Sequence, residues 1–186
     1  PNLQAIDEGS GAFGQRYSQH QLSGGLGGPI VRDRLFVFGS AQYRYRAQGL
    51  QSLLDADRAV LARLGASPDS VRRFLDVLSL SGVPSAAAGA PDENLATNLT
   101  SLWRLDYTVT QGHTLTLRGD WRWGDQEGAR ISPLGVPQSG GTLGSLGGGA
   151  MLTLTSQWES GMINELRVYG SRDNRQTDPY LTLPGG

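Results

Sequence analysis

Few residues in this chain have the types and spacing that an enzyme or a metal site requires. Gly9, Gly11 and Gly14 match the G-x-G-x-x-G string of dinucleotide-binding loops, but no apolar strand precedes them and no helical unit follows. His20 and His113 lie far apart, with no repeated histidine or carboxylate spacing beside them. We therefore expect no catalytic residue, no metal site and no cofactor, and we do not expect an enzyme.

The charged residues that stand out occupy every second position of three segments. Residues two apart on a β-strand share a face, so these side chains are predicted to form a charged ladder on one face of a sheet. They are Arg44, Arg46, Arg104, Asp106, Arg118, Asp120 and Arg122. One interpretation is a mutually paired, hydrated ladder that supports the sheet. A sharper one is that Arg44, Arg46 and Arg122 help to admit an anionic or polar solute.

Between the charged positions lie apolar and aromatic residues. In the run Leu115–Trp123 every odd position is apolar, and the four tryptophans of the chain all fall on this predicted face. Aromatic rings gather at membrane interfaces because they combine an apolar body with a polar tip. The candidates for a lipid-facing aromatic belt are Tyr43, Tyr45, Trp103, Tyr107, Trp121, Trp123 and Trp158. A watery lumen would then wet the charged ladder.

The same alternation predicts six strands joined by connectors of alternating length. The strands are expected at about 17–28, 35–47, 97–110, 113–124, 149–159 and 162–174. The two long connectors differ in character: the first holds a helical loop at about 50–82, and the second is a Gly-rich loop at about 124–148. Short turns at one end and long loops at the other are typical of an up-and-down outer-membrane barrel. A soluble β-sandwich shows the same alternation and stays open as an alternative.

The helical loop is predicted to hold two short amphipathic helices. One covers about residues 52–64, and the second begins after Ser67, an N-cap followed by Pro68. Val71, Leu75 and Leu78 follow helical spacing. We expect the helices to form a cap that packs on itself or on neighbouring loops.

Composition excludes several classes of protein. The 186 residues carry a formal net charge of -1, which argues against a nucleic-acid partner. The chain has no cysteine, and so no disulfide and no zinc–thiolate cluster. Its longest apolar runs fall well short of the ~20 residues of a membrane-spanning helix.

The segment 19–40 resembles an early barrel hairpin of TonB-dependent outer-membrane receptors. The resemblance rests on the Gly-Gly-Pro-Ile turn at 27–30, the basic-Asp-basic triplet at 32–34 and the Phe-x-Phe-Gly strand at 36–39. Weaker matches follow in the order of the family, at 105–107, 113–118 and 164–167. The nearest group is the Oar-like kind, whose members often carry a carboxypeptidase-regulatory-like domain.

This resemblance implies an all-β, antiparallel fragment of a plugged 22-stranded barrel in the cell outer membrane. The expected partners are outer-membrane lipid, the remaining strands and plug of the same protein, TonB acting through that plug, and an unknown small or oligomeric ligand. Residues 1–14 would be a loop or the plug–barrel junction, and 15–186 a partial barrel that lacks the plug and TonB box. Import of a siderophore, vitamin, oligosaccharide or peptide is expected, with secretion left open. The alternatives are a β-sandwich binding module or adhesin with a helical insertion, and a passive porin.

Overall fold

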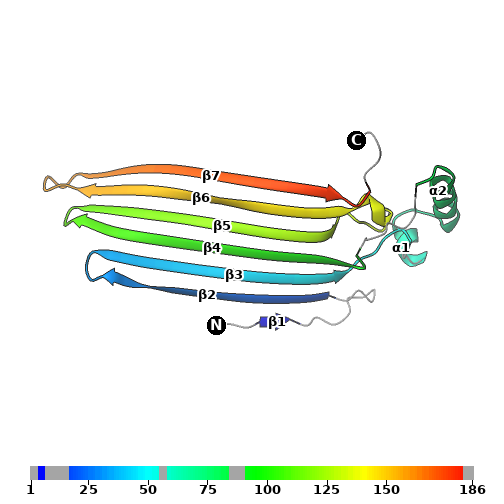
Figure 1. Ribbon diagram of the computed structural model, residues 1–186, viewed down its shortest axis with the longest axis horizontal. Helices are drawn as coiled ribbons and strands as arrows, with labels where there is room; N and C mark the ends of the chain where they lie inside the picture. Colours follow the sequence, from blue (N-terminus) through cyan, green and yellow to red (C-terminus); the bar gives the residue numbers. More distant parts are fainter. Residues whose placement is uncertain (1–3, 7–16, 55–57, 84–90, 182–186) are drawn as a thin grey trace.

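Alternating apolar and polar residues form six long strands in the computed structural model of the protein, with two short helices beyond one end of the sheet (Figure 1). The structure describes residues 4–6, 17–54, 58–83 and 91–181. The long strands are β2 (Tyr17–Val31), β3 (Leu35–Gly49), β4 (Glu93–Thr110), β5 (His113–Ala129), β6 (Gly141–Gln157) and β7 (Ile163–Pro179). A short strand, β1 (Gln4–Ile6), pairs with Gln19–Gln21 of β2.

The strands pair in chain order from β1 to β7, and every pair is antiparallel. The predicted up-and-down meander is therefore confirmed. The sheet is not closed: within the described residues, β1 and β7 are its edges and do not pair with each other. Three short turns lie at one end, here the turn end, and the two helices lie beyond the other, here the loop end (Figure 1).

The predicted bounds were wrong in the Gly-rich segment. β5 continues to Ala129 and β6 begins at Gly141, so most of the expected loop at about 124–148 is strand. Two of its glycines are closely approached by other groups. A Cβ atom on Gly148 would meet the backbone of Asp120, and one on Gly149 would meet the ring of Tyr169. Glycine weakens a strand by itself, but here it admits close neighbours.

The N-terminal prediction is partly tested. Three residues of the expected loop at 1–14 form strand β1, because Gln4–Ile6 pairs with the edge of β2. The remaining residues of that segment, including the G-x-G-x-x-G string at 9–14, lie outside the described residues.

The sheet is a single layer. The accessible surface is 13050 Å², whereas a compact chain of this mass exposes roughly 8,700 Å². Few apolar side chains of the described residues are buried, and three of them, Leu53, Leu61 and Val136, lie in the two long connectors outside the sheet. The second sheet that a β-sandwich requires is not found among the described residues.

The register of the paired strands places apolar residues mainly on one face of the sheet and charged residues mainly on the other. On the apolar face, Trp103 lies opposite Gly119, Leu105 opposite Leu117 and Tyr107 opposite Leu115. The other face, called the polar face here, carries the seven charged residues of the predicted ladder. It includes the pairs Arg104–Arg118 and Thr100–Arg122.

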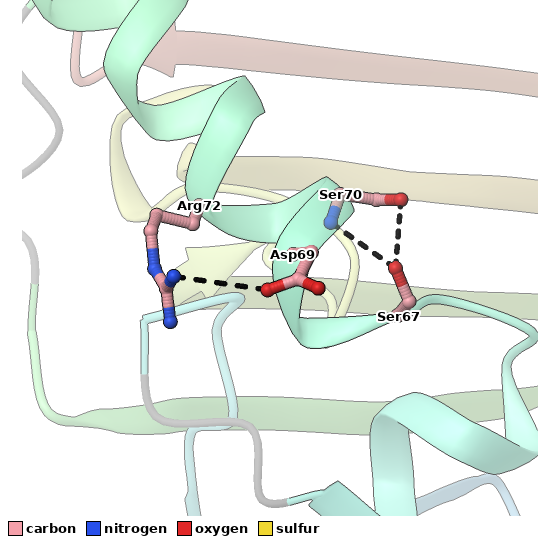
Figure 2. Close-up of polar contacts among 4 residues, drawn as sticks. All are labelled: Ser67, Asp69, Ser70 and Arg72. Atoms are coloured by element: carbon pink, nitrogen blue, oxygen red, sulfur yellow. Dashed lines mark hydrogen bonds and ion pairs between the residues drawn. The ribbon is translucent and has the colours of Figure 1, made fainter.

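The two helices form the expected cap at the loop end. They are α1 (Arg58–Arg63) and α2 (Pro68–Leu80). The Ser67 hydroxyl accepts a hydrogen bond from the Ser70 backbone N–H at 3.1 Å, as an N-cap should, and Arg72 pairs with Asp69 at 3.7 Å (Figure 2). Among the described residues, neither helix has the length and apolar character needed to cross a membrane.

Leu53, Leu61 and Val136 form the small core of this cap, with Leu75 and Leu78 of α2 packed against it. Val136 belongs to the second long loop. In the same loop, the Gly135 carbonyl accepts a backbone hydrogen bond of 2.8 Å from the Leu53 N–H. The prediction that the helices pack on neighbouring loops is confirmed.

The first two short turns are displaced along the strands. Leu35 pairs with Tyr107, so the turn centred on Asp33 is level with Val109. The centre of the next turn, at Gln111–Gly112, lies about 2.5 residues beyond Val109 in the direction of strand β4.

The same displacement recurs at the third turn. His113 pairs with Ser156, so the centre of the second turn, at Gln111–Gly112, is level with residues 157–158. The centre of the third turn, at Ser160, lies about 2.5 residues beyond that level in the direction of β6. At about 3.3 Å per residue, each step is about 8 Å, taken over two strand spacings of about 4.8 Å each. The line of turns thus crosses the strands obliquely.

Candidate functional site

The polar face gathers the charged residues that the sequence singled out. Arg104 and Arg118 are directly opposed, Phe36 is opposed to Asp106, and Leu102 to Asp120. Arg44 and Arg46 lie on β3 in the same alternation, opposite Asn98 and Ala96. The residues on this face are Arg44, Arg46, Arg104, Asp106, Arg118, Asp120 and Arg122. The sequence prediction that they share a face is confirmed.

Asp106 is the centre of one polar cluster near the turn end. Its carboxylate lies 2.7 Å from Arg104 Nε, and it accepts a 2.7 Å hydrogen bond from the Thr116 hydroxyl. The Arg118 guanidinium, on the next strand, has no ion pair among the described residues. The cluster of Arg104, Asp106 and Arg118 therefore carries a surplus positive charge.

A second cluster surrounds Arg122. Its guanidinium lies 3.7 Å from Asp120 on the same strand and 3.6 Å from Asp173 on β7. These are long, half-exposed ion pairs, which contribute little stability and exchange readily with other partners. On β3, Arg44 Nε donates to the Gln21 side chain at 3.3 Å rather than to a carboxylate.

Positive charge exceeds negative charge on the polar face. The register places seven arginines and four carboxylates on this face, although the whole chain carries a net charge of -1. The arginines are Arg44, Arg46, Arg104, Arg118, Arg122, Arg167 and Arg175; the carboxylates are Asp106, Asp120, Glu165 and Asp173. A face with three surplus positive charges attracts anions.

A shallow depression of about 600 Å³ lies on the polar face, over β2 to β5. Its lining includes the small residues Ser23, Gly25 and Ser40. Phe38 and Leu102 add apolar surface, and Asp120 and Arg122 add charge; the lining also includes Gln42 and Thr100. The hollow thus arises where neighbouring strands carry short side chains between larger ones.

Protein-family models, characterised proteins and solved structures were all compared with this chain, and none matches.

The predicted aromatic belt is largely brought onto one face. Six of its members lie on the apolar face: Tyr43, Tyr45, Trp103, Tyr107, Trp121 and Trp123. Trp103 and Trp121 are 37% and 39% exposed, so no second layer covers them. Trp158 was wrongly placed in a strand, because β6 ends at Gln157 and Trp158 begins the turn, where its N–H donates to the Met162 carbonyl at 2.9 Å.

The two histidines do not form a metal site. His20 stacks against Tyr45 with ring centroids 6.3 Å apart, and His113 begins β5 next to a turn. In the part of the chain that the structure describes, no three histidine or acidic side chains are grouped to hold a metal ion.

Strand β7 adds polar-face residues that the sequence analysis did not single out. Glu165 and Arg167 form an ion pair, Asp173 faces Arg122, and Arg175 lies opposite Ser145. The signal was present for Glu165, Arg167 and Asp173, which occupy odd positions of the strand predicted at about 162–174, whereas Arg175 lies one residue beyond it. The same strand also places Arg172 on the apolar face, opposite Gly148.

Proposed function

We propose that this chain is part of the wall of a TonB-dependent outer-membrane receptor, which imports a scarce bulky solute across the outer membrane. In this proposal the strands belong to a closed transmembrane barrel, completed by further strands and a plug of the same protein, and TonB acts through that plug. The apolar face meets lipid and the polar face lines the lumen. The turn end faces the periplasm, and the cap stands outside the cell.

The observation that carries the proposal is the oblique line of short turns. In a membrane barrel the periplasmic turns lie near one plane. A step of about 8 Å over about 10 Å of sheet then requires strands tilted by about 40° from the barrel axis. Closed barrels have tilts of about 35–45°.

The apolar face has the height that a bilayer needs. On β3, the residues that belong to the apolar face are uncharged from Leu35 to Tyr45, a span of ten residue steps. On β5, the residues of the same face are uncharged from Leu115 to Trp123. Ten steps are about 33 Å of strand, which a tilt of about 40° reduces to about 25 Å of height. This equals the apolar band of outer-membrane barrels, about 25 Å.

The open edges support closure by further strands. In hydrocarbon an unpaired backbone group costs several kcal/mol, so a lipid-facing sheet is stable only when its edges are paired. Among the described residues, β7 has no strand on its outer edge, and β1 covers only Gln19–Gln21 of β2. Both edges are therefore seams at which the rest of the barrel would join.

Spin labels on adjacent residues test the proposal. Leu117→Cys and Arg118→Cys, each introduced into a receptor with no other cysteine, give one labelling site on opposite faces of β5; the 186 residues themselves contain none. In the complete receptor in lipid vesicles, we expect the label at 117 to be relaxed by oxygen, which concentrates in hydrocarbon. The matched label at 118 should respond instead to a water-soluble nickel chelate. Equal nickel accessibility at both sites would contradict a lipid-facing sheet.

The plug is tested separately. A plugged receptor should conduct few ions through a planar bilayer, whereas a passive porin would give a steady open conductance. A large, steady conductance from the complete protein would therefore favour the porin and remove TonB from the proposal.

A further inference from the structure

We propose that the depression on the polar face binds a bulky organic anion that carries carboxylate, sulfonate or phosphate groups beside an apolar portion. This inference names the class of solute and rests on the proposed function. Four arginines lie on two sides of the hollow, and Phe38 and Leu102 contribute apolar surface to its lining.

Arginines stand on two sides of the depression. Toward the turn end, Arg104 lies directly opposite Phe38, a lining residue, and Arg118 lies directly opposite Arg104. Toward the loop end, Arg122 is itself part of the lining, and Arg44 follows the lining residue Gln42 by two positions on the same face. A solute in the hollow would therefore meet guanidinium groups at both ends.

The pair Arg104–Arg118 favours an anion at the turn side. Like charges directly opposed across two strands are destabilising, so a counter-charge is needed. Asp106 supplies one, held by Arg104 Nε and by the Thr116 hydroxyl. Arg118 has no acidic partner among the described residues, and its planar fork of donors suits a carboxylate or phosphate oxygen pair.

The loop side offers exchangeable donors. Arg122 lies 3.6–3.7 Å from its two carboxylates, at the long end of an ion-pair distance, and its side chain is 58% exposed. Arg44 contacts an uncharged amide, so its charge is not neutralised by that contact. An incoming anion can thus bind these groups without breaking a buried, tightly paired network.

The interior of the hollow explains why the solute should be bulky and partly apolar. Phe38 is 43% exposed, and its ring lies close to Gly25 and Gly27 of β2. Half-buried Leu102, on β4, adds a second apolar side chain to the lining. The rest of the lining includes short side chains, among them Ser23, Ser40 and Thr100. A volume of about 600 Å³ is within the range of small-molecule sites. A single inorganic ion would leave most of this space unfilled.

The test measures binding of the trisulfonated aromatic dye pyranine to the complete receptor in non-ionic detergent. Pyranine should bind at low salt and ethidium, an aromatic cation, should not, with the affinity for pyranine falling as salt rises. Arg118→Gln and Arg122→Gln should each weaken the binding by roughly tenfold, as expected for the loss of a charge-assisted hydrogen bond. Phe38→Ala should weaken it several-fold without changing the salt dependence.

Arg72→Gln is the matched control, since it removes the same charge from α2, far from the sheet's polar face. It should leave pyranine affinity unchanged. A receptor that inserts as a heat-modifiable barrel but binds pyranine no better than ethidium would overturn this inference and leave the proposed function standing, because an internal segment would then occupy the hollow. Equal losses in Arg72→Gln and Arg118→Gln would overturn it too. A protein that does not insert at all would overturn the proposed function, and this inference with it.

Discussion

The cap and the sheet use apolar residues in opposite ways. The cap buries Leu53, Leu61 and Val136 against one another, as a small water-soluble unit does. In the sheet, Trp103, Trp121 and Trp123 stay more than a third exposed, and the backbone hydrogen bonds between paired strands supply the regular contacts. The cap therefore covers its apolar side chains with its own residues, whereas the described residues leave the aromatic side chains of the sheet partly uncovered, and in the proposed function lipid covers them.

A charge placed on the apolar face should have the largest effect. Leu117 lies opposite Leu105 near the centre of that face. Leu117→Arg should destabilise the folded, lipid-inserted state by about 2–4 kcal/mol, because a guanidinium would face the bilayer midplane. Urea titration in lipid vesicles measures this free energy.

Its neighbour provides the control. Thr116→Arg puts the same side chain on the polar face of the same strand, where Thr116 faces Asp106. Little destabilisation is expected there beyond the lost Thr116–Asp106 hydrogen bond. Equal, large losses at 116 and 117 would show that the faces do not differ in solvent.

Packing within the apolar face should give the next largest effect. A Cβ atom on Gly119 would overlap the Trp103 indole, whereas Gly170, at the same level on β7, has open space. Gly119→Val should therefore displace the indole and cost about 1–3 kcal/mol, the usual range for overpacking. Near-ultraviolet circular dichroism and urea titration would report the change. Gly170→Val should be close to neutral; the reverse order would contradict the placement of Trp103.

Loss of the cap's N-terminal hydrogen bond should have the smallest and most local effect. Ser67→Ala removes the acceptor of the Ser70 N–H and should cost about 1 kcal/mol at the start of α2. Faster amide hydrogen exchange at residues 70–71 would measure it. Ser79→Ala, near the end of the same helix, should leave that exchange rate unchanged. If Ser67→Ala also destabilised the sheet, cap and sheet would not be independent in the way their packing indicates.

Strand order, turn positions and the division of side chains between faces were predictable from sequence, because period-two alternation reports directly on the two faces of a strand. It placed Arg104, Asp106, Arg118, Asp120 and Arg122 correctly on one face. The N-cap at Ser67 was equally predictable, since it depends on neighbouring residues alone.

The remaining features depend on contacts between distant segments. The glycines at 147–149 look like a loop in sequence, and only the approach of Asp120 and Tyr169 shows why strand β6 needs them. The depression, likewise, requires the registers of β2 to β5, since residues from separate strands must meet to form it. Trp158 fits the period-two pattern of its segment, yet it lies past the end of β6. The pattern alone does not show where a strand ends.

The hydrogen bond from Leu53 to Gly135 has a mechanical consequence. It joins the first long connector to the second, and Val136 wedged beside Leu61 reinforces the junction. At the same end, the Tyr180 hydroxyl accepts from the Gly128 N–H at 2.8 Å, fastening the tail of the last hairpin to β5. A force applied to either connector is thus transmitted to the other, so the two connectors are mechanically coupled.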